Sequence, residues 1–329
     1  MKKFKALVLN KKKNNQLISY ELMDEEQLMK GDTLVRINYS TINYKDALAI
    51  TNKRPVIKKW PMIPGVDLSG IIEYSSNKLF QKGDKVILNG YGIGENHYGG
   101  FSQKAKVNSK WLTRLPKLLS TFEAMAIGSA GLTAMLCIME IQKHLKPTDG
   151  KILVTGATGG VGSISVMILS KLGYEVIASS GKKEEVFLLN LGAKEIVSRD
   201  YFNHNNKLLN HQEWIGVIDV VGSKTLANII SKTYYGGIVV ACGLAEGVDL
   251  PTNMMPFIIR AITLKGVESI HTSRRLKQKA WDKISKLIDK KKLKELTTNI
   301  KLTEVEAYSK NLLKSKIKGR IVIDLTKNL

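Results

Sequence analysis

One stretch in the middle of the chain restricts the possible folds more than any other feature. Residues 152–173 read ILVTGATGGVGSISVMILSKLG, in which an apolar run at 152–154 is followed by a glycine-rich turn and a helix-like segment. Gly156, Gly159 and Gly162 follow a GxxGxxG spacing. Such glycines let the backbone turn sharply and approach a pyrophosphate, whose charge the N–H groups at the helix start bind. The stretch therefore predicts a dinucleotide-binding strand, turn and helix. A tight turn without a ligand is the alternative.

The segments that follow this turn predict a parallel sheet. They read AKEIVSRD, GVIDVVG, LANIISKTYYGGIVVACG and AITLKGVES. Continuous apolar strands that alternate with amphipathic helices are typical of a sheet covered by helices on both faces. Ahead of them, a helix is expected to begin at Ser120, because Glu123 three residues later completes a capping box.

The first ~120 residues have a different pattern. Short strand-like runs such as FKALVLN, DTLVRINYS and DKVILNGYG are separated by Gly, Asp and Asn, and they predict an irregular β-barrel. At 329 residues the chain exceeds the usual length of one domain, ~150 residues. We expect a barrel domain over 1–122, a nucleotide domain over 123–264, and a return of 265–329 to the first domain.

The residues after the second strand of the nucleotide domain indicate which dinucleotide binds. A site that prefers NAD usually has Asp or Glu there to accept from the ribose 2′-OH. Here the strand YEVIASS ends in Ser179 and Ser180, Gly181, Lys182 and Lys183 come next, and Arg199 follows the next strand. Hydroxyl and cationic groups would hold a 2′-phosphate that a carboxylate would repel. The predicted cofactor is NADPH.

The charge balance is strongly basic. There are 51 Lys and Arg against 29 Asp and Glu, a formal net charge of +22. This fits a nucleic-acid binder, a membrane-surface protein or an enzyme for anionic substrates. Because the lysines are dispersed and no aromatic-basic recognition motif is interleaved with them, we expect mainly solvated surface and no specific nucleic-acid site.

Two further features bear on the compartment. Cys137 and Cys242 are too few for a disulfide scaffold or a four-thiolate zinc site. The start MKKFKALVLNKKKNN has no apolar stretch of signal-peptide length, and no segment is expected to provide the ~20 apolar residues that span a bilayer. The expected location is the reducing cytoplasm, without membrane attachment.

Motifs along the whole chain resemble one enzyme family. They are NYKDALA (43–49), IPGVDLSG (63–70), GENHYGG (94–100), AMAIGSAGLTAM (124–135), the glycine turn, PFIIR (256–260) and KGR (318–320). Together they look like the zinc-free quinone-oxidoreductase branch of the medium-chain dehydrogenase/reductases, and within it the NADPH-dependent acryloyl-CoA reductases. The resemblance implies an α/β protein with a GroES-like β-barrel catalytic domain and a doubly wound Rossmann domain. It also implies a homodimer that pairs through edge strands, near 262–267.

The resemblance also implies residue roles. Tyr44 would bind cofactor, position the thioester or donate a proton, although a barrel tyrosine without chemistry is the alternative. Asp46 would organise Tyr44 and its neighbours, or only cap a turn. A substrate-binding role is implied for His97, which as a lone histidine could equally be structural. The other predicted substrate contacts are Asn43, Arg54 and Lys58. The predicted cofactor contacts, some from the sequence pattern and some from the resemblance, are Tyr44, Thr133, Gly159, Gly160, Val161, Gly162, Ser180, Gly181, Lys182, Arg199, Leu244, Ile258, Ser269 and Arg320.

No metal site is predicted. Zinc-dependent relatives carry a Cys in the early barrel and a His-Glu pair after the Pro-Gly turn. This chain has Asn43 at the first position and Val66-Asp67 at the second. Two thiols about a hundred residues apart, without a clustered His, do not form a zinc site.

The sequence favours reduction of the C=C bond of acryloyl-CoA to propanoyl-CoA. Hydride would reach the β-carbon and a proton the α-carbon, while hydrogen-bond donors stabilise the enolate oxygen. Arg54 and Lys58 would then attract the CoA phosphates. One alternative is an NADPH-dependent quinone, enone or enal reductase of the same fold. A more distant one is a non-catalytic NADPH sensor or nucleic-acid-binding protein.

Overall fold

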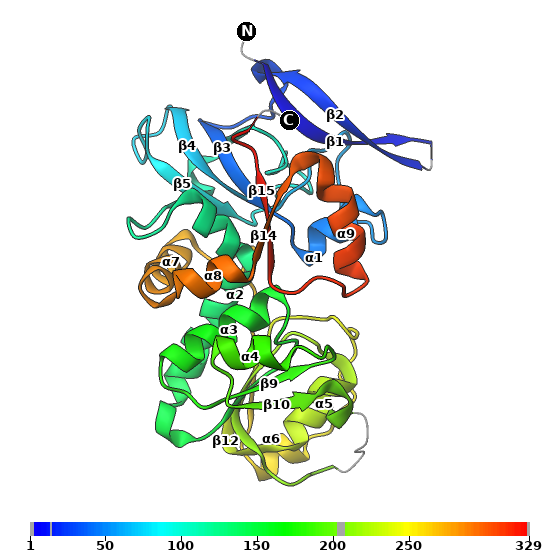
Figure 1. The fold of residues 1–329 in the computed structure, drawn as a ribbon, viewed down its shortest axis with the longest axis vertical. Coiled ribbons are helices and arrows are strands. Elements are labelled where there is room, and N and C mark those ends of the chain that lie inside the picture. Colours follow the sequence, from blue (N-terminus) through cyan, green and yellow to red (C-terminus); the bar gives the residue numbers. More distant parts are fainter. Residues whose placement is uncertain (1–2, 14, 203–207, 328–329) are drawn as a thin grey trace. The chain divides into compact units, whose positions relative to one another are not determined.

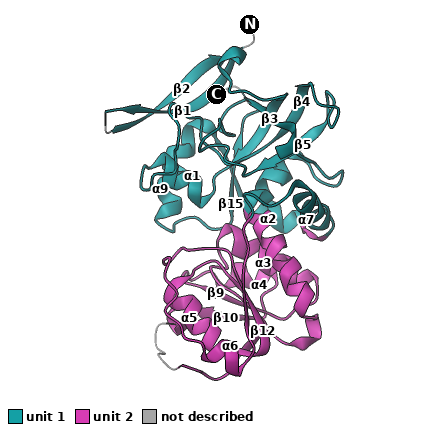
Figure 2. Cartoon of the chain, turned by 180° about the vertical axis from the view of Figure 1, so that it is seen from behind, with its two compact units in different colours: residues 1–129, 269–286, 290–329 teal, residues 130–268, 287–289 magenta. Residues whose placement is uncertain are grey.

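The computed structural model describes residues 3–13, 15–202 and 208–327. The chain divides into two compact units, which Figure 2 shows in different colours. The first comprises residues 1–129, 269–286 and 290–329, and the second 130–268 and 287–289. The domain bounds expected from the sequence are 1–122 with 265–329 for one domain and 123–264 for the other. That these segments fold as independent domains stays a prediction, which limited proteolysis can test.

The first unit is built on a seven-stranded sheet with the order β14-β15-β3-β4-β5-β7, in which β6 pairs with β3. The C-terminal strand lies antiparallel to β3, which brings the two ends of the sequence into one sheet. A separate hairpin, β1 (Lys3–Lys12) and β2 (Asn15–Asp24), adds to the same apolar core. The sheet strands are β3 (Thr33–Thr41), β4 (Asp67–Ser75), β5 (Lys85–Asn89), β6 (Lys104–Val107), β7 (Thr113–Arg114), β14 (Thr297–Lys301) and β15 (Arg320–Asp324).

Short helices surround this sheet. Helix α1 (Tyr44–Ile50) begins directly after β3 and lies against α9 (Val305–Leu313), as Figure 1 shows. The segment WPMIPG (60–65) is loop with one isolated bridge from Met62 to Leu9, as its two prolines predicted. The other helices are α7 (Arg274–Leu287), α8 (Lys290–Glu295) and the 3₁₀ turns 25–27, 109–111 and 302–304.

Helix α2 (Thr121–His144) begins at the predicted capping box, where the Ser120 N–H donates to Glu123 Oε2. Non-helical backbone at Gly128, with φ of 54°, interrupts the helix. By length and hydropathy α2 is long enough to cross a membrane, which corrects the expectation that no segment qualifies. However, 89% of its apolar window is buried inside the protein, as in the core helix of a globular fold.

The second unit is the predicted doubly wound sheet. Six parallel strands have the order β10-β9-β8-β11-β12-β13, and Figure 1 shows α3 and α4 on one side with α5 on the other. The elements are β8 (Ile152–Val154), α3 (Gly160–Lys171), β9 (Val176–Ser180), α4 (Glu185–Leu191), β10 (Glu195–Ser198), β11 (Trp214–Asp219), α5 (Ser223–Ser231), β12 (Thr233–Ala241), α6 (Met255–Ile259) and β13 (Thr263–Gly266), with 3₁₀ turns at 147–149 and 199–202.

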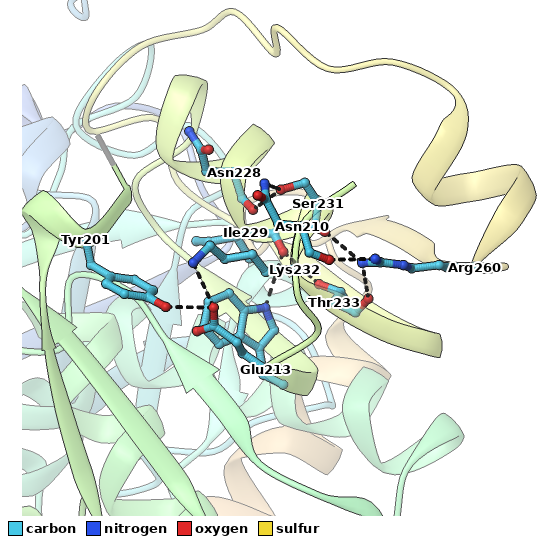
Figure 3. A network of polar contacts seen from close by, with 10 residues as sticks. Tyr201, Asn210, Glu213, Asn228, Ile229, Ser231, Lys232, Thr233 and Arg260 are labelled. Carbon is cyan, nitrogen blue, oxygen red and sulfur yellow. Dashed lines mark hydrogen bonds and ion pairs between the residues drawn. The ribbon is translucent and has the colours of Figure 1, made fainter. Parts of the chain in front are cut away.

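A polar network anchors the loop after α6. Arg260, the last residue of the PFIIR motif, donates to the carbonyl oxygens of Asn210, Ser231 and Thr233 at 2.6 to 3.4 Å (Figure 3). These bonds satisfy the carbonyl groups where α5 ends and β12 begins. The motif arginine therefore has a structural role in the second unit.

Candidate active site

The glycine turn in the second unit has the geometry of a phosphate cradle. Gly156 has φ of +55°, a conformation that L side chains rarely adopt. A Cβ on Gly162 would lie 2.4 Å from the Gly156 carbonyl oxygen, so α3 can approach the turn this closely only with glycine there. Gly159 is the N-cap of α3, and Gly160, Val161 and Gly162 form its first turn, whose N–H groups have no partner within the helix. The turn therefore fits a dinucleotide pyrophosphate.

The carboxyl ends of β9 and β10 bring four predicted residues together. Ser180 pairs in register with Ser198, which places Gly181 beside Arg199. A Cβ on Gly181 would lie 3.0 Å from the Arg199 guanidinium carbon. Ser180 Oγ accepts from the Lys182 N–H at 3.0 Å and lies 3.1 Å from Thr158 Oγ. The Ser180 hydroxyl, the Arg199 guanidinium and the backbone of Lys182 thus lie next to Gly181 at the end of β9, where an adenosine ribose binds in this topology.

Sequence reasoning missed a buried carboxyl group that connects the ends of β8 and β11. Asp219, at the end of β11, accepts from Thr155 Oγ1 at 2.7 Å and from the Gly222 N–H at 2.8 Å. Burial raises the pKa of its carboxyl group. The contact with Thr155 joins the end of β11 to the residue that follows β8, where the glycine turn begins. A polar residue that closes an apolar strand, as in GVIDVVG, was the signal available in the sequence.

In the first unit, a buried polar network surrounds the side chain of Asn43, the residue that precedes α1. Asn43 Nδ2 donates to Asp67 Oδ2 at 2.8 Å, and Asn43 Oδ1 accepts from Arg320 at 3.2 Å. Asp67 also accepts from Asn89 and from both the N–H and the hydroxyl of Ser129. Burial lowers the pKa of Arg320 to about 10, against the opposing effect of the nearby aspartates. The side chains of Asn43 and Arg320 are therefore held by protein groups.

Asp46 completes the cap of α1. Its Oδ2 accepts from the Asn43 N–H at 2.8 Å, and its Oδ1 accepts from the Val66 N–H at 2.9 Å. The side chain is buried, and this burial raises its pKa from the ordinary 3.8 to about 7. Asp46 thus joins α1 to the Pro-Gly loop, in agreement with the capping alternative.

Tyr44 is the first residue of α1, and its side chain is 54% exposed. Its neighbour Lys45 donates to the buried Glu95 at 2.5 Å, and Lys58 lies 3.8 Å from the same carboxylate. This ion pair connects the NYKD and GENHYGG motifs and was not predicted. The only signal was a lysine in NYKD and a glutamate in GENHYGG, and two residues 50 positions apart in the sequence give no local pattern that would predict their contact.

His97 lies in the GENHYGG loop with both ring nitrogens near backbone carbonyl oxygens. Nδ1 is 3.2 Å from the Tyr98 oxygen, and Nε2 is 3.1 Å from the Lys30 oxygen. The ring also meets Trp111 edge-on at 5.3 Å. These contacts give His97 a role in bracing the loop, and its proposed substrate contact stays a prediction.

The remaining predicted residues lie outside these groups. Thr133 is nearly buried on α2, and Ser269 is half-buried at the start of the segment that returns to the first unit. Leu244 and Ile258 are 66% and 70% exposed in the second unit, after β12 and on α6. Arg54 is exposed in the loop after α1.

The residues at the zinc positions of related enzymes do not fit a metal. Asn43 offers an amide already bonded on both sides, and the carboxylate of Asp67 is occupied by four hydrogen bonds. Over the described ranges, the structure contains no group of three or more His, Cys, Asp or Glu that could hold a metal ion.

Comparisons with known proteins agree with this geometry. Residues 160–288 match the zinc-binding dehydrogenase family, and residues 29–117 match the alcohol dehydrogenase GroES-like domain. The chain is 42% identical to a probable acrylyl-CoA reductase of Escherichia coli K12, over 97% of this chain and 98% of the relative. It is 39% identical to the acrylyl-CoA reductase of Ruegeria pomeroyi, over 98% and 99%. The crystal structure of an oxidoreductase from Salmonella enterica in complex with NADP has a TM-score of 0.96 and 42% identity, covering 98% of this chain and 100% of that one.

These likenesses span both units and confirm the predicted fold class. The chain belongs to the medium-chain dehydrogenase/reductase family, in the branch that contains the acrylyl-CoA reductases and the quinone-oxidoreductase-like proteins.

Proposed function

We propose that this protein is an NADPH-dependent reductase of acryloyl-CoA that forms propanoyl-CoA. The observation that carries the proposal is the full-length likeness, at 39% and 42% identity, to two acrylyl-CoA reductases. An α,β-unsaturated thioester needs a hydride at its β-carbon, a proton at its α-carbon and donors for its enolate oxygen. The two units hold residues suited to these tasks.

The second unit would hold the cofactor. The first turn of α3 would bind the pyrophosphate through its N–H groups, and Ser180, Lys182 and Arg199 would bind the 2′-phosphate. NADPH, when bound, supplies the hydride. The compactness of the turn supports this assignment, because a Cβ on Gly156 would lie 2.4 Å from Val220 and one on Gly162 would lie 2.4 Å from the Gly156 carbonyl oxygen. Only glycines allow the backbone to fold tightly enough here for its N–H groups to approach a pyrophosphate.

The first unit would hold the reacting thioester. Tyr44 is the first residue of α1 and is exposed, and its phenol can donate a hydrogen bond to the thioester oxygen or a proton to the α-carbon. The buried bonds of Asn43, Asp46 and Arg320 fix the backbone beneath it. Since these bonds form within the protein, the backbone that carries Tyr44 is fixed before substrate binds.

Steady-state oxidation of NADPH with acryloyl-CoA, crotonyl-CoA and a benzoquinone in parallel tests the substrate class. The proposal expects the highest kcat/KM with acryloyl-CoA. Equal or greater efficiency with the quinone would instead assign the protein to the quinone reductases of the same fold.

The role of Tyr44 is tested by Tyr44→Phe, with Tyr74→Phe as the matched control because Tyr74 is a 60% exposed tyrosine on β4. Loss of a donor to developing charge lowers kcat by about 10²-fold. KM for NADPH should change little. If the two variants have the same kcat, Tyr44 has no part in the chemistry.

Two further proposals concern assembly and compartment. A homodimer that pairs through β13 is supported by the position of β13 at the sheet edge and by the exposed side chains of Met254 and Ile259 nearby. Light scattering of the purified protein tests it.

A reducing cytoplasm is supported by Cys137 and Cys242, because both are free thiols. They lie close enough to interact, since a hydrogen bond with Cys242, together with burial, raises the pKa of Cys137. Cell fractionation tests the location.

A further inference from the structure

The first unit contains a second polar concavity, at the opposite end of α1 from Tyr44. It has a volume of about 190 Å³ and is lined by residues of three segments. The hairpin contributes Lys11 and Gln16, the end of α1 contributes Asn52, and the following loop contributes Arg54, Ile57 and Trp60. Pockets that enclose a drug-sized ligand usually exceed ~300 Å³, so this one suits one end of a larger molecule.

The walls of this pocket are fixed to one another. Gln16 Nε2 donates to the carbonyl oxygens of Ala49 and Ile50, at 2.9 Å each, which ties the hairpin to the end of α1. Leu9 and Met62 exchange backbone hydrogen bonds of 2.8 and 3.0 Å, which tie the hairpin to the loop. The pocket is therefore a built feature of the unit.

The lining has the chemistry of a nucleotide phosphate site. Lys11 and Arg54 supply two cations, and across residues 3–13, 15–202 and 208–327 neither of them forms an ion pair. Trp60 supplies a half-buried indole on which a purine can stack. Gln16 and Asn52 add side-chain amides. Two cations beside an aromatic ring suit an adenine that carries a phosphate.

The loop connects this pocket with the proposed reaction site. Helix α1 has seven residues, a length of about 10 Å, with Tyr44 at one end and the pocket at the other. Lys58 follows Arg54 in the loop and, with Lys45, faces the single carboxylate of Glu95. Lys45 is next to Tyr44 in the sequence and Lys58 is next to Ile57 of the pocket, so two ammonium groups on one carboxylate leave a positive balance beside both, which suits a pyrophosphate.

We infer that this pocket binds the 3′-phosphoadenosine end of a CoA thioester. The inference rests on the proposed function, because that function places the acyl end of the same molecule at Tyr44. A basic groove on α7, lined by Arg274, Arg275, Lys279, Lys283 and Lys286, is the competing location. It has no aromatic residue among its lining side chains and is formed by a single helix, so it lacks a surface for the base.

Kinetics with truncated substrates test the inference. The substrates are acryloyl-CoA, its 3′-dephospho form and acryloyl-pantetheine, and the variant is Lys11→Ala/Arg54→Ala. Each exposed charge contact contributes less than about 1 kcal/mol, so the loss of two should lower kcat/KM for acryloyl-CoA by about tenfold. The value for acryloyl-pantetheine, which has no phosphoadenosine, should not change. The 3′-dephospho form should show an intermediate loss. Lys279→Ala/Lys283→Ala, which removes the same charge from α7, is the matched control and should have no selective effect.

Either an equal loss with all three substrates or a selective loss in the α7 variant alone would overturn the inference. A binding measurement separates the inference about the pocket from the proposed function. Calorimetry measures the binding of adenosine 3′,5′-bisphosphate to protein saturated with NADP. Binding that disappears in the Lys11→Ala/Arg54→Ala variant supports the pocket even if acryloyl-CoA is not reduced. Absence of binding, or binding that the variant leaves intact, argues against the pocket even if acryloyl-CoA is reduced.

Discussion

Asn43 belongs to a family motif, yet its side-chain amide bonds to other groups of the protein. Its oxygen accepts from Arg320 and its nitrogen donates to Asp67, so the amide has one orientation. The sequence suggested Asn43 and Arg320 as ligand contacts. It could not show that they contact each other, because they are 277 residues apart and meet through the pairing of β15 with β3.

Removal of the buried charge at Asp67 should destabilise the first unit strongly. An Asn at this position presents one oxygen to the four donors that the carboxylate now satisfies, and Arg320 loses a neighbouring negative charge. We expect Asp67→Asn to lower the free energy of unfolding by about 3–5 kcal/mol, as measured by urea denaturation. Asp84→Asn, whose partner Arg114 is exposed, should cost less than about 1 kcal/mol. Similar losses in the two variants would contradict this account.

Asp46 should make stability depend on pH near neutrality. Its pKa is about 7 in the folded protein and near 3.8 when unfolded, so between these values only the folded chain keeps the proton. The contribution to stability is therefore fully present below pH 4 and is lost as the pH rises to about 7. The difference in unfolding free energy between wild type and Asp46→Asn should fall across this window and level off above it. A difference that stays constant from pH 4 to pH 8 would mean that Asp46 is ionised throughout.

At the scale of secondary structure, the strand ends determine where chemistry can occur. The periodicity of apolar residues predicted β8, β9, β10 and the terminal strand, because buried parallel strands and a capped helix leave clear local patterns. The contact of Arg199 with Gly181 depends in addition on the register of β9 with β10. Register follows from packing between strands, so the sequence could suggest Arg199 only by its place after a strand.

Cofactor choice should change when the residues after β9 change. Ser180→Asp with Lys182→Ala replaces a hydroxyl by a carboxylate and removes a cation. The new carboxylate would repel a 2′-phosphate. We expect the ratio of kcat/KM for NADPH to that for NADH to fall by about 10- to 100-fold. Lys194→Ala, at the opposite end of β10, is the control and should leave the ratio unchanged. A ratio within about threefold of wild type in the double variant would show that the 2′-phosphate binds elsewhere.

For the whole molecule, composition was informative in one respect and misleading in another. The hydropathy of α2 meets the criterion for a membrane span, yet the helix is buried because it packs in the core. Composition cannot distinguish these two environments, since both favour apolar side chains. The net charge of +22, in contrast, is a property of the whole surface and acts at long range on any anionic ligand.

This net charge should affect the binding of anionic substrates. CoA carries phosphates, whereas a short acryloyl thioester is neutral, so only the first is attracted by the excess of lysine and arginine. The screening length falls from about 10 Å at 0.1 M salt to about 3 Å at 1 M. Added salt should therefore raise KM for acryloyl-CoA several-fold while KM for acryloyl-N-acetylcysteamine stays nearly constant, in assays with NADPH kept saturating. Parallel increases for the two thioesters would indicate that salt acts on the protein or on cofactor binding. In that case the basic surface would have no part in attracting substrate.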